Sequence, residues 1–225
     1  MVNPDDPTDQ PAEPGLRVGY VPGVTLTKWR RVWAERLPGI RLEVEPVAQA
    51  GQREALLSGR VAMCFVRLPL DTDRLHLIAL YDEVTVVVAP KDHPVAAYDE
   101  LTLADLAGEP LVPDGPDAFD RVAWGAGLLL VPHSVARSVS RRDLVRRPVS
   151  DAEPTPVGLA WPVEPVTARA QAPRPDLIEE FIGIVRGRRA TSSRTAADRS
   201  ARGEDPSPTP GRTSGRKPGA VSRTT

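Results

Sequence analysis

The sequence predicts a mixed α/β protein built around a parallel sheet, and two observations carry this prediction. Between Leu16 and Arg67, three apolar segments with strand character alternate with two segments of helical character. Further along, an apolar run rich in β-branched residues occupies positions 84–88, and Pro90 follows it. Strand–helix–strand passes with right-handed crossovers bring such strands together in one parallel sheet.

The first half of the chain predicts its elements in order. Strands are expected over 16–20, 40–47 and 61–67, with a helix over 25–37 and a short helix that carries Leu56 and Leu57 between them. Apolar residues of the longer helix recur at i, i+3, i+7 and i+11 and therefore share one face: Leu26, Trp29, Trp33 and Leu37. Pro38 and Gly39 end that helix.

The second half predicts a buried strand over 84–88, then a short helix and an apolar strand within 101–112. A small-residue turn at 125–127 leads into another apolar strand, which Pro132 closes. A returning strand is expected within 141–161 and a closing helix over 176–187. The apolar residues of the closing helix lie on one face: Leu177, Phe181, Ile184 and Val185.

Composition indicates the cellular compartment of the protein and distinguishes both termini from the folded part of the chain. Cys64 is the single cysteine, so no internal disulfide can form, which suits a reducing cytosol. No apolar run approaches the roughly 18 residues of a membrane span, and the first 14 residues are acidic and proline-rich, unlike a secretory signal. We therefore expect a cytoplasmic protein with a disordered acidic N-terminus over 1–14 and a disordered tail over 189–225.

The net charge of −1 hides an opposition between the tail and the body. From Arg186 to the C-terminus there are ten basic residues and three acidic ones, which puts about +7 on the tail and about −8 on the rest. Such a basic tail is either a solvated segment or an arm that makes weak, nonspecific contact with nucleic acid. It has no aromatic side chain to stack on bases, so sequence-specific recognition by the tail is not expected.

Two segments carry a family resemblance: LIALYDEVTVVVAPKDHPVA at 77–96 and VAWGAGLLLVPHSVAR at 122–137. They resemble consecutive pieces of the effector-binding domain of LysR-type transcriptional regulators, in which a strand and a His-Pro turn are followed by a Gly-x-Gly segment. The resemblance runs from about residue 16 to residue 188 with one internal gap. It implies a two-lobed fold like that of type 2 periplasmic binding proteins, with lobe I formed by 15–84 and 158–188 and lobe II by 85–157.

The chain departs from the family pattern in two places. Only residues 113–121 lie where the family has several dozen residues with a further strand and helix, so we expect a reduced second lobe. The family's N-terminal winged helix-turn-helix has no counterpart before the first strand at Leu16. The chain is thus expected to be a sensor domain that depends on a DNA-binding partner for any effect on transcription. The resemblance also implies pairing with a second copy.

The turn between the first strand and the first helix is the leading candidate for a ligand site. Gly23, Val24, Thr25 and Thr27 lie where an α/β sheet presents a helix N-terminus, with unpaired N–H groups, to an anion. The alternative is that a threonine only caps the helix. In the resembled family this loop contacts small effectors, often carboxylates.

Three further residues belong to the predicted ligand site. Arg67, at the end of its strand, could bind a carboxylate, or it could be a surface arginine or pair with Asp71 or Asp73. Trp124, just before Gly125, could stack on a ligand, but filling the space left by the missing strand and helix is the favoured interpretation. If the indole fills that space, the pocket between the lobes is occluded.

Catalysis and metal binding find no support in the sequence. His76, His93 and His133 lack the spacing of a metal site, and His93 is explained by the turn it shares with the family. Cys64 is expected to be a small core residue. We therefore expect no enzyme, cofactor or metal, but a sensor of a small, anionic metabolite. The alternative is a non-sensing interaction protein with an occluded cleft and a tethering tail.

Overall fold

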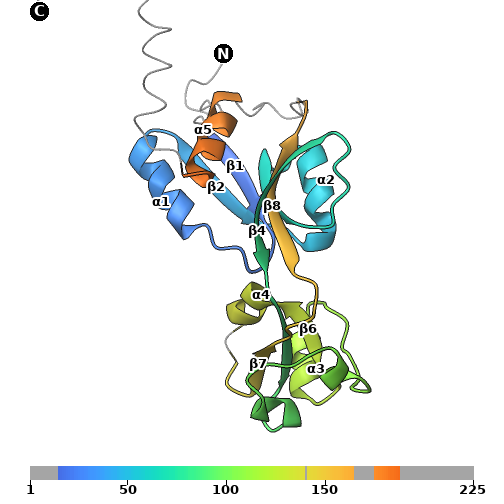
Figure 1. The fold of residues 1–225 in the computed structure, drawn as a ribbon. Coiled ribbons are helices and arrows are strands. Elements are labelled where there is room, and N and C mark those ends of the chain that lie inside the picture. The colour runs from blue at the N-terminus through green and yellow to red at the C-terminus, as the bar shows by residue number, and fades with distance from the viewer. Residues whose placement is uncertain (1–14, 140, 165–174, 188–225) are drawn as a thin grey trace, which may run out of the picture. The chain divides into compact units, whose positions relative to one another are not determined.

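The computed structural model describes residues 15–139, 141–164 and 175–187, so the predictions for 1–14 and 189–225 lie outside it (Figure 1). Within the described residues the strands form two sheets. The larger has the order β2-β1-β3-β8-β4, and the smaller has the order β6-β5-β7. The protein is therefore a mixed α/β structure with two sheets, as the sequence predicted.

The larger sheet combines parallel and antiparallel pairing. Strands β1 (Gly15–Tyr20), β2 (Arg41–Pro46) and β3 (Met63–Arg67) are parallel, which confirms the predicted strand–helix–strand passes. Strand β8 (Thr155–Pro162) runs antiparallel to β3, and β4 (Leu75–Glu83) runs antiparallel to β8. A strand from late in the chain thus lies between two early ones.

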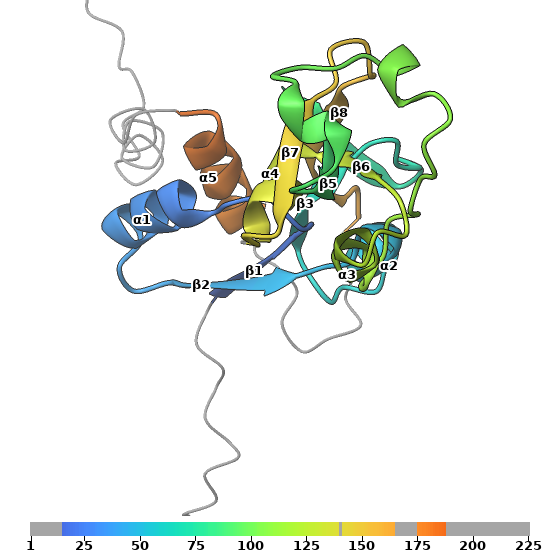
Figure 2. The same cartoon turned by 90° about the horizontal axis from the view of Figure 1, so that it is seen from below.

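Helices cover both faces of this sheet. Helices α1 (Thr27–Arg36) and α5 (Pro175–Val185) lie side by side on one face, and α2 (Gln52–Leu57) lies on the other (Figures 1 and 2). An ion pair of 3.0 Å between Arg36 and Glu180 joins α1 to α5. The alternation of side chains along each strand explains how one sheet supplies two apolar cores, one on each face.

The core beneath α1 and α5 is built on aromatic side chains. The predicted stripe of α1 faces it: Trp33 is buried, and Trp29 stacks on Phe65 of β3 with ring centroids 4.6 Å apart. Phe181 of α5 meets Trp33 and Phe65 edge-on, at 5.8 and 6.1 Å. These contacts fix the first strand-to-helix loop relative to the end of β3.

The start of α1 differs from the prediction. The helix begins at Thr27, not at residue 25, and its N-cap residue is Leu26, with no side chain capping the end. The interpretation of Thr25 or Thr27 as a helix cap is therefore wrong. The turn before the helix, in which the Val24 N–H bonds to the Val21 carbonyl, takes up the residues that the sequence assigned to the first helical turn.

The smaller sheet has β5 (Thr85–Pro90) at its centre, with β6 (Leu129–Pro132) and β7 (Leu144–Pro148) antiparallel on either side. Two short helices, α3 (Ala118–Ala123) and α4 (His133–Ser138), pack with it. Val86, Val87 and Val88 are buried as predicted, but Val84 is 56% exposed because it lies between the two sheets' strands. The buried strand therefore starts one residue later than predicted.

Two expectations for the segment after β5 are wrong. Residues 101–112 form a 3-10 turn (Ala104–Leu106) and isolated bridges from Leu101 to Val149 and from Leu111 to Leu128, instead of a helix and a strand. Helix α3 forms partly within 113–121, where the sequence suggested only a connection. Its buried residues Ala118 and Val122 pack under β5 and β6, so this segment contributes to the core.

The chain passes from the larger sheet to the smaller one between Glu83 and Thr85 and returns between Pro148 and Thr155. The domain ranges 15–84 with 158–188, and 85–157, remain a prediction. We use the names lobe I and lobe II below for the residues of the larger and smaller sheets with their helices. No helix among the described residues is long and apolar enough to cross a membrane.

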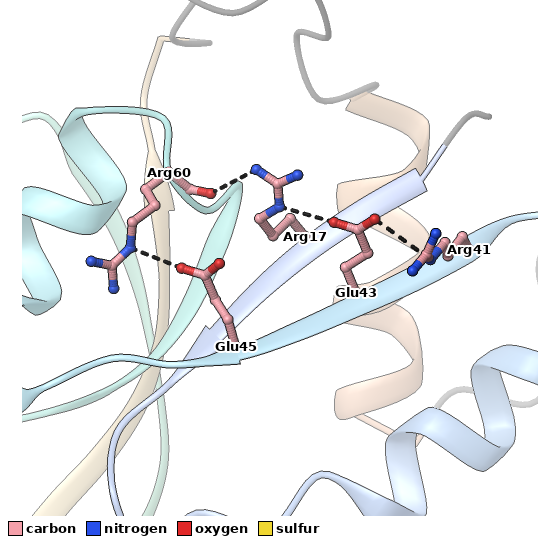
Figure 3. Close-up of polar contacts among 5 residues, drawn as sticks. All are labelled: Arg17, Arg41, Glu43, Glu45 and Arg60. Carbon is pink, nitrogen blue, oxygen red and sulfur yellow. Dashed lines mark hydrogen bonds and ion pairs between the residues drawn. The ribbon is translucent and has the colours of Figure 1, made fainter. Parts of the chain in front are cut away.

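Strand β2 is an edge of the larger sheet, and charged side chains line it (Figure 3). Glu43 pairs with Arg17 at 3.0 Å and with Arg41 at 3.5 Å, while Glu45 pairs with Arg60 at 2.8 Å. Exposed charges on an edge strand oppose pairing with the strands of other molecules. This network therefore opposes the addition of a strand from another molecule at the β2 edge.

Candidate functional site

Arg67, the last residue of β3, is the centre of the candidate site. Its side chain is almost fully buried, with 1% of the residue exposed. Its Nη1 donates to the Pro22 carbonyl at 2.9 Å, and its Nη2 donates to Glu83 Oε2 at 2.7 Å and to Ser134 Oγ at 3.2 Å. One guanidinium thus connects the β1–α1 loop, the end of β4 and helix α4.

The interpretations of Arg67 as a surface residue or as the partner of Asp71 or Asp73 are wrong. Arg53 of α2 holds those carboxylates instead, at 3.1 Å to Asp71 and 3.9 Å to Asp73. Glu83, 16 positions from Arg67, is the true partner, and it is also buried, at 8% exposure. The antiparallel path from β3 through β8 to β4 brings the two residues together.

One nitrogen of this guanidinium makes no hydrogen bond. Arg67 Nε is buried and has no hydrogen-bond partner among the described residues. Buried polar groups in folded proteins are nearly always paired, so an orphaned N–H beside a charged group indicates a position where an acceptor can bind. Nε is therefore a donor that remains available to a further acceptor without the loss of an existing hydrogen bond.

Gln52, at the start of α2, holds the main chain of Arg67. Its side-chain Oε1 accepts from the Arg67 N–H at 3.0 Å, and its Nε2 donates to the Arg67 carbonyl at 2.8 Å. Gln52 is itself buried, and both polar atoms of its amide are used in this pair of bonds. The main chain of Arg67 is thus held by a residue of α2, on the face of the sheet opposite α1 and α5 (Figure 1).

The β1–α1 loop lies against lobe II through Gly23. This glycine has a φ of +90°, and a Cβ built on it would lie 2.3 Å from Ser134 Oγ and 2.9 Å from the Ser134 carbonyl carbon. Val24 is buried, while Thr25 and Thr27 are exposed. Gly23 thus lies directly against Ser134, which is a hydrogen-bond partner of Arg67.

Trp124 does not fill a space in the interior. It follows α3 and is 79% exposed, so the favoured interpretation of a space-filling indole is wrong. Gly125, with a φ of +77°, has no heavy atom within 4 Å of a Cβ built on it. No hydrogen bond or ion pair of the described residues connects either position to Arg67.

Tyr81 reports on the electrostatics near Glu83. Burial raises the pKa of the Tyr81 phenol, the negative charge of Glu83 raises it further, and Arg67 lowers it. The negative charge of Glu83 thus acts on the Tyr81 phenol, although the positive charge of Arg67 offsets part of this effect. The negative charge of Glu83 therefore belongs to the electrostatic environment of the site.

Other reactive side chains have structural roles. His93 Nδ1 accepts from the Val95 N–H and caps a 3-10 turn, as expected for a turn residue. Cys64 is fully buried in β3, and burial raises the pKa of its thiol to about 12. Among the residues that the structure covers, no group of three or more His, Cys, Asp or Glu side chains could hold a metal ion.

Sequence reasoning missed three residues of the site: Gln52, Glu83 and Ser134. Glu83 carried the clearest signal, because it is an acidic residue at the end of a strand that leads directly into an apolar run. Gln52 and Ser134 are ordinary polar residues near helix starts. No local pattern distinguishes them from solvated ones.

Comparison with known proteins gives a consistent result at the level of family and fold. Residues 10–121 match the family model for the LysR substrate binding domain. The chain is 28% identical over 107 residues to the HTH-type transcriptional regulator AlsR of Bacillus subtilis. This match covers 46% of this chain and 35% of AlsR. It is 40% identical over 99 residues to the HTH-type transcriptional regulator CatR of Pseudomonas putida, covering 43% of this chain and 34% of CatR. The similarity thus spans about a third of the length of these regulators.

Solved structures extend the likeness of fold to most of the chain. The BenM effector binding domain with its effector benzoate aligns with a TM-score of 0.59 at 21% identity, covering 86% of this chain and 96% of that one. The reduced form of the OxyR regulatory domain of Pseudomonas aeruginosa aligns with a TM-score of 0.57 at 22% identity, covering 77% of this chain and 95% of that one. The curated relatives are transcriptional regulators, not enzymes.

Proposed function

Because this chain belongs to the LysR substrate-binding domain family, we propose that it senses a small anionic metabolite and acts in transcriptional regulation through a partner. Effector sensing in regulation follows from the family itself. The charge of the ligand, its position and the partner are our proposals. The buried guanidinium of Arg67, whose Nε makes no hydrogen bond, is the observation that carries them.

The proposed site lies between the β1–α1 loop and the end of β3. A carboxylate there would accept from Arg67 and face the N-terminus of α1, where the N-cap residue Leu26 makes no side-chain capping hydrogen bond. The exposed hydroxyls of Thr25 and Thr27 add donors on the same loop, and Gly23 and Val24 shape it. Benzoate, named as the effector of BenM, is an aromatic carboxylate and a rational first probe.

Trp124 and Gly125 remain proposed ligand contacts, with a changed role. An exposed indole is available to stack on an aromatic ligand, which a buried one would not be. If Trp124 contributes, Trp124→Ala weakens benzoate binding and leaves acetate binding unchanged. The alternative of a cleft occluded by Trp124 has lost its supporting observation, because the indole does not fill the interior.

Regulation is proposed to act through a DNA-binding regulator as partner, and pairing with a second copy of this chain is a separate proposal. Binding of the ligand would favour one arrangement of the protein over another and so change that association. We place this activity in the cytoplasm, and we propose weak, nonspecific contact of the basic tail with nucleic acid. A chain truncated after residue 188 would then bind duplex DNA more weakly than the full chain, and the difference would vanish at high salt.

A thermal-shift screen of the full chain tests the proposed function. Small carboxylates, aromatic acids and sugar phosphates form the panel, and a ligand at 100 times its dissociation constant stabilises by about 2.7 kcal/mol. For a protein of this size that corresponds to a rise in Tm of about 5–10 °C. Thr25→Val should reduce the rise, and Thr72→Val, which removes an exposed hydroxyl away from the loop, should not. A stable protein that responds to no anion in the panel would contradict the proposal.

A further inference from the structure

The charge of Arg67 is already balanced inside the protein. Glu83 accepts from Arg67 Nη2 at 2.7 Å, and both side chains are withdrawn from solvent, at 2% and 8% exposure. A pair of this kind is held strongly in place, because either charge left alone in the interior would be unfavourable. A ligand anion therefore meets a guanidinium that already has a counter-ion.

The donor inventory of Arg67 shows what an incoming carboxylate would find. A guanidinium has five N–H donors. Nη2 has used both of its hydrogens, on Glu83 and Ser134, while Nη1 has used one on the Pro22 carbonyl. Nε and the second hydrogen of Nη1 remain, and these two point to different sides of the guanidinium. The strong two-pronged pairing of a carboxylate with adjacent nitrogens thus requires Nη2, and it requires displacement of Glu83 or Ser134.

We propose that Glu83 is a specificity-determining residue that competes with a ligand carboxylate for Arg67. This inference rests on the proposed function, since it concerns the same site. The internal carboxylate lowers the affinity for every simple carboxylate and leaves Arg67 neutralised when no ligand is present. Ligands are then selected by whether their remaining contacts with the site compensate for the displacement of Glu83.

Asp82 provides a matched control. It precedes Glu83 in β4 and is exposed, so Asp82→Asn removes the same charge from the same strand without touching the Arg67 pair. A general effect of net charge on anion binding would appear in both variants. An effect of internal competition would appear in Glu83→Gln alone.

The experiment is isothermal titration of the full chain with benzoate and with acetate, at one pH and ionic strength. We expect Glu83→Gln to bind these carboxylates about tenfold more tightly than the unmodified protein, and Asp82→Asn to bind them about equally well. Equal affinities in Glu83→Gln and the unmodified protein would overturn the competition while leaving the proposed function intact. Failure of every protein to bind either carboxylate would overturn the competition, and the response of the unmodified protein to the full panel of anions would then decide the proposed function.

A second measurement covers the case in which Glu83→Gln is poorly stable. Removal of Glu83 leaves the buried charge of Arg67 without its partner, so the variant is expected to unfold at a lower temperature. Acetate should then raise the Tm of Glu83→Gln more than that of the unmodified protein, with chloride at the same concentration as the reference. Glu83→Asp keeps the charge and should respond like the unmodified protein. An equal response of Glu83→Gln and Glu83→Asp would also overturn the competition.

Discussion

Gly23 lies directly against Ser134, so that a Cβ at position 23 would come within 2.3 Å of the Ser134 hydroxyl oxygen. The same hydroxyl accepts from Arg67, and the residue before Gly23 supplies a carbonyl to the same guanidinium. The β1–α1 loop and helix α4 therefore meet over a buried charge. Side-chain size at position 23 decides whether this contact can form.

Replacement of Gly23 by alanine should destabilise the protein through two effects. The positive φ costs about 1 kcal/mol for a residue with a Cβ, and the clash with Ser134 adds about 1–3 kcal/mol. Gly108→Ala is the matched control, because Gly108 has a similar φ of +95° but nothing within 4 Å of its Cβ position. Urea unfolding of both variants separates the two effects, and equal losses would show that the Ser134 contact is not tight.

Replacement of Gln52 by leucine should reduce the free energy of unfolding by about 1–3 kcal/mol, because the N–H and carbonyl of Arg67 would lose their partners in the interior. Gln49→Leu makes the same chemical change at an exposed position three residues earlier. Chemical denaturation should show little change for that control. A neutral Gln52→Leu would mean that solvent or another group replaces the amide.

Replacement of Trp124 by alanine should change the free energy of unfolding by less than about 0.5 kcal/mol, since its side chain is exposed. Trp33→Ala should cost about 3–5 kcal/mol, because Trp33 is buried against Phe181 and donates to the Ile40 carbonyl. Thermal unfolding of the two variants tests the assignment. A large loss for Trp124→Ala would restore the interpretation of the indole as a filler of the core.

The Cys64 thiol should be unreactive in the folded protein. Burial raises its pKa to about 12, so the nucleophilic thiolate is scarce at neutral pH. Because the unfolded thiol loses its proton first, the free energy of unfolding should fall as pH rises above about 8.5. A thiol-specific disulfide reagent reports on Cys64 alone, since the chain has one cysteine. Rapid labelling of native protein would contradict the buried assignment, and labelling after denaturation is the control.

The sequence by itself determined the elements whose signals are local. Three features could be predicted from the sequence: the apolar face with Leu26, Trp29 and Trp33, the parallel strands of lobe I and the family resemblance. Their signals are local, because periodicity and turn residues act over a few positions. It placed the candidate loop and Arg67 correctly at the ends of neighbouring strands. Boundaries were less certain, as the start of α1 shows.

Only the tertiary structure decided which groups meet at Arg67 and which side chains are exposed. Pro22, Glu83 and Ser134 lie 45, 16 and 67 positions from Arg67, and it is the return of β8 and the approach of α4 that bring them to one guanidinium. Trp124 likewise could not be assigned to core or surface from its neighbours in sequence, because exposure depends on what packs over it. Side-chain pairing and burial depend on chain segments that are far apart in sequence, so they cannot be deduced from a residue and its sequence neighbours alone.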